Sequence, residues 1–267
     1  MQRPGPEKVH ALLPQIDAVD LNVELYREAG VFILRRALPT ATVQNWQSAL
    51  QVFYATTLAA GRKVYASNPV AVSEALPREL AAVHRHEKLL DIAETIHGAD
   101  IALYNQRLLV KDQHGRAAVF THQDFAYQTG WPDKTSVFVP LDPADADNGG
   151  MIFYPGTHHY GYLGDAGEIS SDSFSSLPTF CPRLEPGDVV LMHPFTWHES
   201  GPHRHGPDRA TVQIYYQPSD DPSGTALLRG QWRTEIFIGD PRPERLFRRS
   251  RVGRLREMQA EIDKRSS

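Results

Sequence analysis

Four residues of this chain could together hold a metal ion and its co-substrate: His122, Asp124, His198 and Arg209. Residues two apart on an extended segment point to the same face, so His122 and Asp124 can present an imidazole and a carboxylate to one ion. His198 would complete a set of two histidines and one carboxylate, which is the facial donor set of non-haem iron oxygenases. Arg209 lies eleven residues after His198 on what should be the following strand. There its guanidinium could pair with the carboxylate of a co-substrate that chelates the metal.

Other histidines compete for the third metal position. His193 is five residues before His198, and an odd separation places it on the opposite face of an unbroken strand. Pro194 makes an unbroken strand unfavourable, so this argument supports His198 without excluding His193. His84 and His86 lie in a helical stretch, where residues two apart face away from each other. We therefore expect His198 to be the ligand and the other three histidines to pack or to lie at the rim of the site.

The segments around these residues follow a recognisable order. Residues 148–158 read NGGMIFYPGTH, Gly187-Asp188 forms a turn before an apolar strand, and an apolar strand follows Arg209. Together with the His-x-Asp pair, these features resemble the phytanoyl-CoA dioxygenase family of 2-oxoglutarate oxygenases over about residues 21–217. The family's pattern is matched position by position at the metal ligands, the NGG segment, the Gly-Asp turn and the arginine. One departure is Thr121, because a tryptophan often precedes the histidine in this family; it affects the local pocket wall and leaves the ligands intact.

The resemblance implies an enzyme with Fe(II) as its metal, 2-oxoglutarate as co-substrate and O₂ as oxidant. We expect Fe(II) on His122, Asp124 and His198, and the distal carboxylate of 2-oxoglutarate on Arg209, assisted by Ser200 and Tyr104. The expected reaction hydroxylates an unactivated C–H bond of a small-molecule metabolite, such as an amino acid or a secondary-metabolite intermediate, and releases succinate and CO₂. A carboxylate at position 124 favours hydroxylation, or a related desaturation or oxidative cyclisation, over halogenation.

Two other classes of function remain open. A cupin-type metal enzyme, such as an isomerase or hydrolase, could use the same ligands without 2-oxoglutarate, although Arg209 and Ser200 argue against it. A non-catalytic binding or scaffold protein could keep the fold alone, although the intact ligands argue against that.

The expected substrate pocket draws on aromatic and cationic residues near the ligand pair and from the loop after the second helix, because aromatic walls suit a lipophilic or cyclic molecule. These residues are Phe125, Tyr127, Gln128, Trp131, Tyr65, Asn68 and Arg107. Arg107 and Lys111 could also meet an anion. Alternation along a strand allows only some of Tyr104, Arg107 and Lys111 to face the pocket.

Hydrophobic periodicity predicts one domain over residues 1–267, with helices before strands. Residues 1–16 should be irregular, and the helical part spans about residues 17–98. It includes a helix capped by Asp20 and ended by Gly30, a strand over 31–35, and a helix opened by Pro39-Thr40. Short strands are expected in the core, about residues 99–220, over 101–110, 117–123, 135–141, 151–154, 188–193 and 209–217. The fold class is therefore mainly β, a double-stranded β-helix (jelly roll, cupin-like) core with N-terminal and flanking α-helices.

Composition narrows the partners and the location. The chain has 267 residues, a net charge of −4 and one cysteine, Cys181. These values predict no nucleic-acid partner and no internal disulfide. The sequence has no apolar run of about 18 residues and no signal-peptide pattern at its start, so we expect a cytoplasmic protein with no membrane partner, as a monomer or homodimer. The extension over about residues 221–267 contains an arginine-rich segment, 242–264. We expect it to be an amphipathic helix packed on the body or a dimer contact, with an anionic partner or CoA-type phosphate as the alternative.

Overall fold

The computed structural model describes residues 6–59, 76–111, 118–163, 171–206 and 208–233. Tyr65, Asn68 and the arginine-rich segment therefore lie outside the described residues. The helices are α1 (Pro6–Leu12), α2 (Val23–Ala29), α3 (Thr40–Ala59), α4 (Arg78–Ala81) and α5 (Glu87–His97). The strands are β1 (Asp17–Ala18), β2 (Val31–Leu34), β3 (Ile101–Lys111), β4 (Val119–His122), β5 (Thr135–Pro140), β6 (Met151–Phe153), β7 (Val189–Met192), β8 (His198–Ser200), β9 (Arg209–Pro218) and β10 (Ala226–Arg229).

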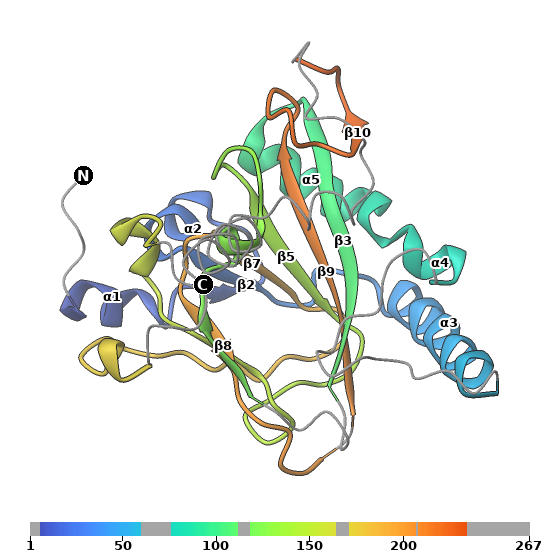
Figure 1. The fold of residues 1–267 in the computed structure, drawn as a ribbon, viewed down its shortest axis with the longest axis horizontal. Coiled ribbons are helices and arrows are strands. Elements are labelled where there is room, and N and C mark those ends of the chain that lie inside the picture. Colours follow the sequence, from blue (N-terminus) through green and yellow to red (C-terminus); the bar gives the residue numbers. More distant parts are fainter. Residues whose placement is uncertain (1–5, 60–75, 112–117, 164–170, 207, 234–267) are drawn as a thin grey trace, which may run out of the picture.

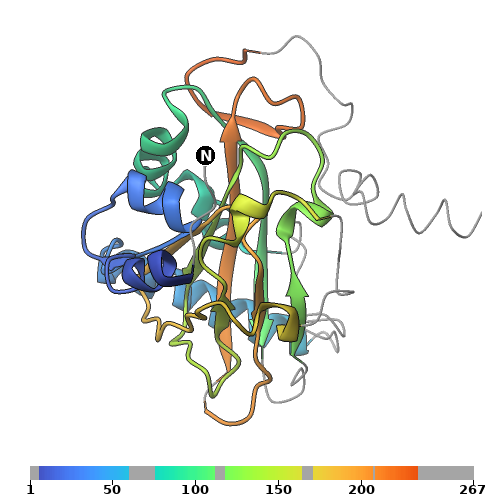
Figure 2. The same cartoon turned by 90° about the vertical axis from the view of Figure 1, so that its left-hand side faces the viewer.

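The strands form two sheets. A seven-stranded sheet has the order β1-β2-β7-β5-β9-β3-β10, and a three-stranded sheet has the order β4-β8-β6. All pairs are antiparallel except β1 with β2. The long strands β3, β9 and β5 lie side by side in Figure 1, with α3, α4 and α5 beyond them. Figure 2 shows the helices on one side of these strands and β4 on the other. The protein is thus mostly β, with helices covering the outer face of the large sheet.

Local sequence explains how the N-terminal helices begin and end. The Asn22 side chain accepts a hydrogen bond from the Leu25 backbone at 3.1 Å, so Asn22 caps α2 and the expected cap at Asp20 is wrong. Gly30 ends the helix in the left-handed conformation, as expected. The chain then enters β2, whose four residues are all buried. Helix α3 buries Val43, Trp46, Leu50 and Phe53, as their three-to-four-residue spacing requires.

The strand pattern of the core was largely predictable. Each of the six expected core strands is present, with ends that differ by up to two residues. Helix α1 falls within the segment expected to be irregular. The two-residue β1, the three-residue β8 and β10 were not expected, because so few residues carry no readable periodicity.

A single large apolar cluster joins the helices to the sheet. It includes residues of α3 and α5 together with β2, β5, β7 and β9. No helix in the described part of the chain is both long and apolar enough to cross a lipid bilayer.

Candidate active site

The inner face of the large sheet presents three pairs of residues on β3 and β9. Arg107 lies opposite Gln213, Leu109 opposite Thr211, and Lys111 opposite Arg209. Directly paired residues of antiparallel strands project to the same side, and so do residues two apart on one strand. All six residues line one cavity of about 300 Å³. The first and last pairs are four residues apart, about 13 Å along the strand.

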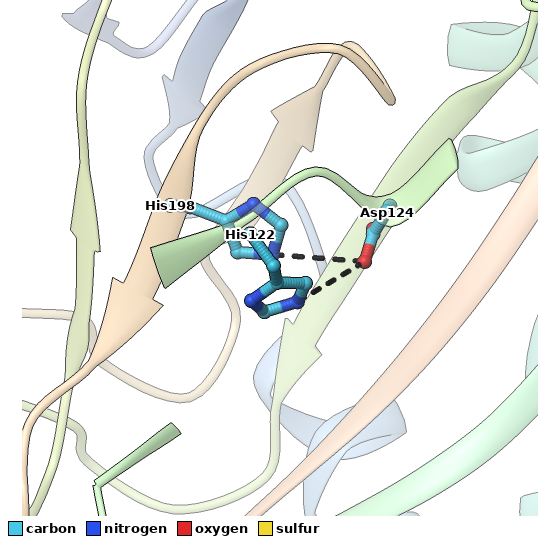
Figure 3. Close-up of side chains that lie close together, drawn as sticks. All are labelled: His122, Asp124 and His198. Atoms are coloured by element: carbon cyan, nitrogen blue, oxygen red, sulfur yellow. Dashed lines mark ion pairs between the residues drawn. The ribbon is translucent and has the colours of Figure 1, made fainter. Parts of the chain in front are cut away.

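At the Arg107–Gln213 end of the cavity, His122, Asp124 and His198 meet. One potential ligand atom from each lies within 4.8 Å of the others. Asp124 Oδ1 is 3.7 Å from His122 Nε2 and 3.6 Å from His198 Nε2, and Figure 3 shows both rings directed toward this carboxylate. His122 and His198 are brought together by pairing of β4 with β8, while Asp124 opens the short 3₁₀ turn after β4. The three expected ligands thus form one buried cluster.

The hydrogen bonds of the two histidines leave the correct nitrogens for a metal. His122 Nδ1 is 2.8 Å from the Phe120 carbonyl, and His198 Nδ1 is 3.0 Å from the Thr196 carbonyl. A carbonyl oxygen only accepts, so each Nδ1 carries a proton, and Nε2 is the nitrogen that faces the cluster and can bind a metal. Burial, with a contribution from His198, lowers the pKa of His122 to about 3, which keeps that ring neutral. Two imidazoles and a carboxylate fit Fe(II) chemically.

The carboxylate of Asp124 is oriented by the sheet behind it. Its Oδ2 accepts hydrogen bonds from Ser136 Oγ at 2.8 Å and from Gln213 Nε2 at 3.1 Å. Gln213 Oε1 in turn accepts a bond from Arg107 Nε at 2.6 Å. Burial acts to raise the pKa of Asp124, but the two ligand histidines, Arg107 and Ser136 outweigh it, so the pKa is lowered. Asp124 is therefore held ionised, with Oδ1 directed toward the histidines.

Arg209 lies buried at the other end of the cavity. Its guanidinium donates to the backbone carbonyls of Asn148, at 3.3 Å, and Gly149. Ser200 and Lys111 line the cavity beside it. Burial lowers the pKa of Arg209 to about 10, which leaves the group charged at neutral pH. Within the described residues, neither Arg209 nor Lys111 has a carboxylate partner. An unpaired buried charge is costly, so this end of the cavity is suited to an anion.

Some of the other expected site residues line the cavity, and others lie outside it. Arg107 and Tyr127 line the cavity. Tyr104 does not reach Arg209: its hydroxyl accepts a bond from the Thr129 backbone, and it packs against Tyr215. Phe125 is buried against Tyr162 and Phe195, outside the cavity lining.

Two further residues after the ligand pair also lie outside the cavity lining. Trp131 is half exposed, and Gln128 is buried. His193 packs against His158 and Phe195, away from the metal cluster. Of the described residues expected in the substrate pocket, Arg107 and Tyr127 are the two that line the cavity.

Sequence reasoning overlooked three contributions to the site. Ser136 and Gln213 orient the metal carboxylate, and Phe120 lines the cavity two residues before His122. Gln213 carried a usable signal, since it lies four residues after Arg209 and must share its face of the strand. Nothing in the sequence around Ser136 indicates that β5 lies behind Asp124.

Comparison with known proteins agrees with the family resemblance seen in the sequence. A family model described as phytanoyl-CoA dioxygenase (PhyH) matches residues 26–211. An ectoine dioxygenase of Streptomyces anulatus is 31% identical over 116 residues, which cover 42% of this chain and 39% of that protein. A probable alpha-ketoglutarate-dependent hypophosphite dioxygenase of Stutzerimonas stutzeri is 29% identical over 150 residues, 51% of this chain and 52% of that protein.

Solved structures share the fold. The crystal structure of EctD from S. alaskensis with 2-oxoglutarate and 5-hydroxyectoine matches with a TM-score of 0.63 at 20% identity, covering 86% of this chain and 85% of that one. At this identity the likeness concerns the fold. The sequence matches span about two fifths and one half of the two curated relatives.

Proposed function

Because the chain belongs to the phytanoyl-CoA dioxygenase family, we propose that it is an Fe(II)- and 2-oxoglutarate-dependent oxygenase that hydroxylates an unactivated C–H bond of a small-molecule metabolite. One observation carries this proposal. A single cavity has a buried cluster of two histidines and an aspartate at one end and a buried, unpaired cation, Arg209, at the other. A cupin-type metal enzyme without 2-oxoglutarate would have no use for this second end.

The two ends of the cavity match the two ends of 2-oxoglutarate. His122, Asp124 and His198 would hold Fe(II), and the 2-oxo acid end of the co-substrate would bind at the metal. Arg209 and Ser200 would bind the distal carboxylate, since a buried guanidinium forms strong, oriented bonds to carboxylates. With Fe(II) bound, the site supplies O₂-dependent decarboxylation of 2-oxoglutarate to succinate and CO₂, coupled to oxidation of the substrate C–H bond.

Other residues of the chain position the metal-binding carboxylate and exclude water from the site. Ser136 and Gln213 fix the metal carboxylate, so that it does not rotate toward the substrate. Apolar side chains of Phe120, Phe138 and Met151 line the cavity and keep water from the reacting atoms. Tyr127 and Arg107 would face the substrate near the metal.

The dimensions of the cavity favour a small substrate. Its volume of about 300 Å³ is at the lower end of ligand pockets and would be shared with the co-substrate. The relatives named for ectoine and hypophosphite act on small molecules, which supports this class. We also infer that the two sheets are those of a double-stranded β-helix, with the two histidine ligands on the small sheet, Asp124 in the turn after β4, and the co-substrate cation on the large sheet.

A succinate-release assay tests the proposed function. Purified protein would be supplied with Fe(II), 2-oxoglutarate and O₂, and offered a panel of amino acids and small polar or cyclic acids. We expect succinate to increase over the uncoupled background with at least one member of the panel. Protein that binds the metal but neither binds nor consumes 2-oxoglutarate would contradict the proposal and favour a different metal enzyme.

The alternative outcomes at the same site are desaturation and ring closure. They consume the same co-substrate and differ in the product. Mass spectrometry separates them, because hydroxylation adds one oxygen atom, whereas desaturation and oxidative cyclisation without oxygen insertion each remove two hydrogen atoms.

A further inference from the structure

Thr196 lies in the segment between β7 and β8, two residues before the metal ligand His198. Its backbone carbonyl accepts a hydrogen bond from His198 Nδ1 at 3.0 Å, and its hydroxyl donates to the Gly30 carbonyl at 2.7 Å. The residue is fully buried and lies outside the cavity lining. Thr196 therefore connects a metal ligand to the end of helix α2 without reaching the cavity.

The two ligand histidines differ in how their carbonyl partners are held. Phe120, the partner of His122, belongs to β4 and is fixed with that strand. Thr196 precedes β8, which begins at His198, so its carbonyl lies outside the β4–β8 ladder. Because the ladder does not fix this carbonyl, another contact must hold it. The bond from the Thr196 hydroxyl to Gly30 is such a contact.

The end of α2 is shaped to receive Thr196. Gly30 ends the helix with a φ of +71°, and a Cβ at this position would lie 2.5 Å from Thr196 Oγ1 and would also clash with the His158 ring. The Gly30 carbonyl accepts the Thr196 hydroxyl together with the His193 backbone N–H, at 2.9 Å. Glycine thus allows the helix and the segment before His198 to approach closely, besides allowing the left-handed conformation.

The Thr196 hydroxyl is not needed to satisfy the Gly30 carbonyl. The His193 N–H already donates to it, and one partner is enough for a buried carbonyl. Valine would fill the same space without burying a hydroxyl. A threonine side chain is stiff about its first torsion, so a hydroxyl held by Gly30 also limits rotation of the backbone that carries it. The carbonyl directed at His198 belongs to that backbone.

We propose that Thr196 is a positioning residue for the metal: its hydroxyl, held by the Gly30 carbonyl at the end of α2, fixes the carbonyl that orients His198. The inference rests on the proposed function, since it concerns a metal ligand assigned there, and deepens it by giving helix α2 a part in the site. Loss of the hydroxyl would let the His198 ring rotate. One of the three bonds to the ion would then weaken, while His122 and Asp124 keep their own hydrogen bonds.

Titration of metal-free protein with Co(II) tests the proposal without turnover, because the visible absorption of bound Co(II) reports both its affinity and its ligand geometry. Thr196→Val keeps the shape of the side chain and removes the hydroxyl. We expect the Co(II) affinity to fall by about tenfold, the lower end of the range for groups that orient a metal ligand, and the visible spectrum to change. Thr196→Ser keeps the hydroxyl and should retain most of the wild-type affinity and the wild-type spectrum.

Thr225 offers a matched control. Its backbone N–H and its hydroxyl both donate to the Leu103 carbonyl, at 2.6 and 3.0 Å, so this carbonyl also accepts one N–H and one threonine hydroxyl. Neither Thr225 nor Leu103 lines the cavity. Thr225→Val should lower the free energy of unfolding of the metal-free protein about as much as Thr196→Val does, and should leave the Co(II) affinity and spectrum unchanged.

A measurement on the wild type needs no variant, so it decides the matter even if Thr196→Val fails to fold. The His193 N–H shares the Gly30 carbonyl with the Thr196 hydroxyl. If a metal on His198 holds Thr196 and Gly30 together, Zn(II) should slow hydrogen exchange of the His193 N–H. Exchange of the Thr225 N–H should stay the same. Nuclear magnetic resonance of metal-free and Zn(II)-bound protein measures both.

The outcomes separate this inference from the proposed function. Wild type that binds neither Co(II) nor Fe(II) would overturn the proposed function. Wild-type Co(II) affinity and spectrum in Thr196→Val, or an equal loss of affinity in Thr225→Val, would overturn only the role of Thr196. The same holds if Thr196→Ser loses as much affinity as Thr196→Val, or if Zn(II) leaves exchange of the His193 N–H unchanged.

Discussion

The two ligand histidines are oriented for metal binding by the same local hydrogen bond. Each donates its Nδ1–H to the backbone carbonyl two residues earlier, Phe120 for His122 and Thr196 for His198. The ring is thereby fixed within its own segment, and only the pairing of β4 with β8 is needed to bring the two Nε2 atoms together. Asp124 is different, because its orientation depends on residues of β5 and β9.

Replacement of Asp124 by alanine should remove most of the affinity for Fe(II) and the activity with it. The carboxylate would supply the only negative charge of the three-residue cluster and one of its three bonds to the ion. Metal content after desalting, measured by atomic emission, checks this. Ser136→Ala is the matched control, since it removes one hydrogen bond to Asp124 and should leave the metal largely bound. Wild-type metal content in Asp124→Ala would show that Asp124 is not a ligand.

Replacement of Arg209 by alanine should raise the 2-oxoglutarate requirement and leave metal binding nearly unchanged. Truncating one partner of a buried charged pair costs about 2–5 kcal/mol, which is roughly thirtyfold or more in affinity at 1.4 kcal/mol per decade. Calorimetry with 2-oxoglutarate measures the change, and Arg183→Ala, at an exposed arginine, serves as the control. An unaltered affinity would mean that Lys111 or Arg107 holds the co-substrate alone.

Strand parity decides which of the predicted site residues face the cavity. Arg107, Lys111 and Arg209 face the cavity because each is an even number of residues from its neighbours on β3 or β9. Tyr104 is an odd number of residues from Arg107 and falls at a register shift, so the placement expected for it near Arg209 is wrong. Phe125 could not be placed in advance, because the chain leaves its extended conformation at Asp124 and enters a 3₁₀ turn.

At the level of secondary structure, the cap of α2 gives a direct test of structure against sequence. Asn22→Ala should lower the free energy of unfolding by about 1 kcal/mol, since it removes the side-chain acceptor for the Leu25 N–H. Asp20→Ala, at the exposed position that the sequence favoured, should change it by less than about 0.5 kcal/mol. Urea denaturation measures both. A larger loss in the free energy of unfolding for Asp20→Ala than for Asn22→Ala would mean that Asp20 is the cap.

Helices and strands with a clear hydrophobic periodicity were predictable from the sequence. Short strands that form only because neighbouring strands pair with them were not. The six core strands and α3 carry their own apolar pattern. By contrast, β8 has three residues, His198–Ser200, and forms because β4 and β6 flank it. The histidine at its start could be expected as a ligand only because the neighbouring motif and the distance to Arg209 pointed to it.

At the level of the whole molecule, one buried ion pair ties the segment after the metal ligands to the far end of the large sheet. Lys134 Nζ pairs with Asp221, and both side chains are fully buried. Asp221 also accepts a bond from the Trp131 backbone at 2.9 Å, and the lysine lies 5.0 Å from the centre of the Tyr104 ring. Tyr104 thus has a structural position in this network.

Lys134→Met should destabilise the protein by about 3–5 kcal/mol, because it leaves the Asp221 charge buried without its partner. The double variant Lys134→Met/Asp221→Leu should recover part of the loss, since no charge is then left uncompensated. Chemical denaturation of the wild type and of both variants gives the values. A loss below about 1 kcal/mol in the single variant would mean that water or another group compensates Asp221.

The central claim, that His122, Asp124 and His198 hold Fe(II) at one end of a cavity whose other end binds 2-oxoglutarate, is tested most directly by anaerobic binding of both ligands. Fe(II) content and calorimetric 2-oxoglutarate binding would be measured for the wild type, His198→Ala and His193→Ala. We expect one Fe(II) and one 2-oxoglutarate per chain in the wild type and in His193→Ala, and loss of Fe(II) in His198→Ala. Metal retained by His198→Ala but lost from His193→Ala, or Fe(II)-loaded wild type that does not bind 2-oxoglutarate, would contradict the claim.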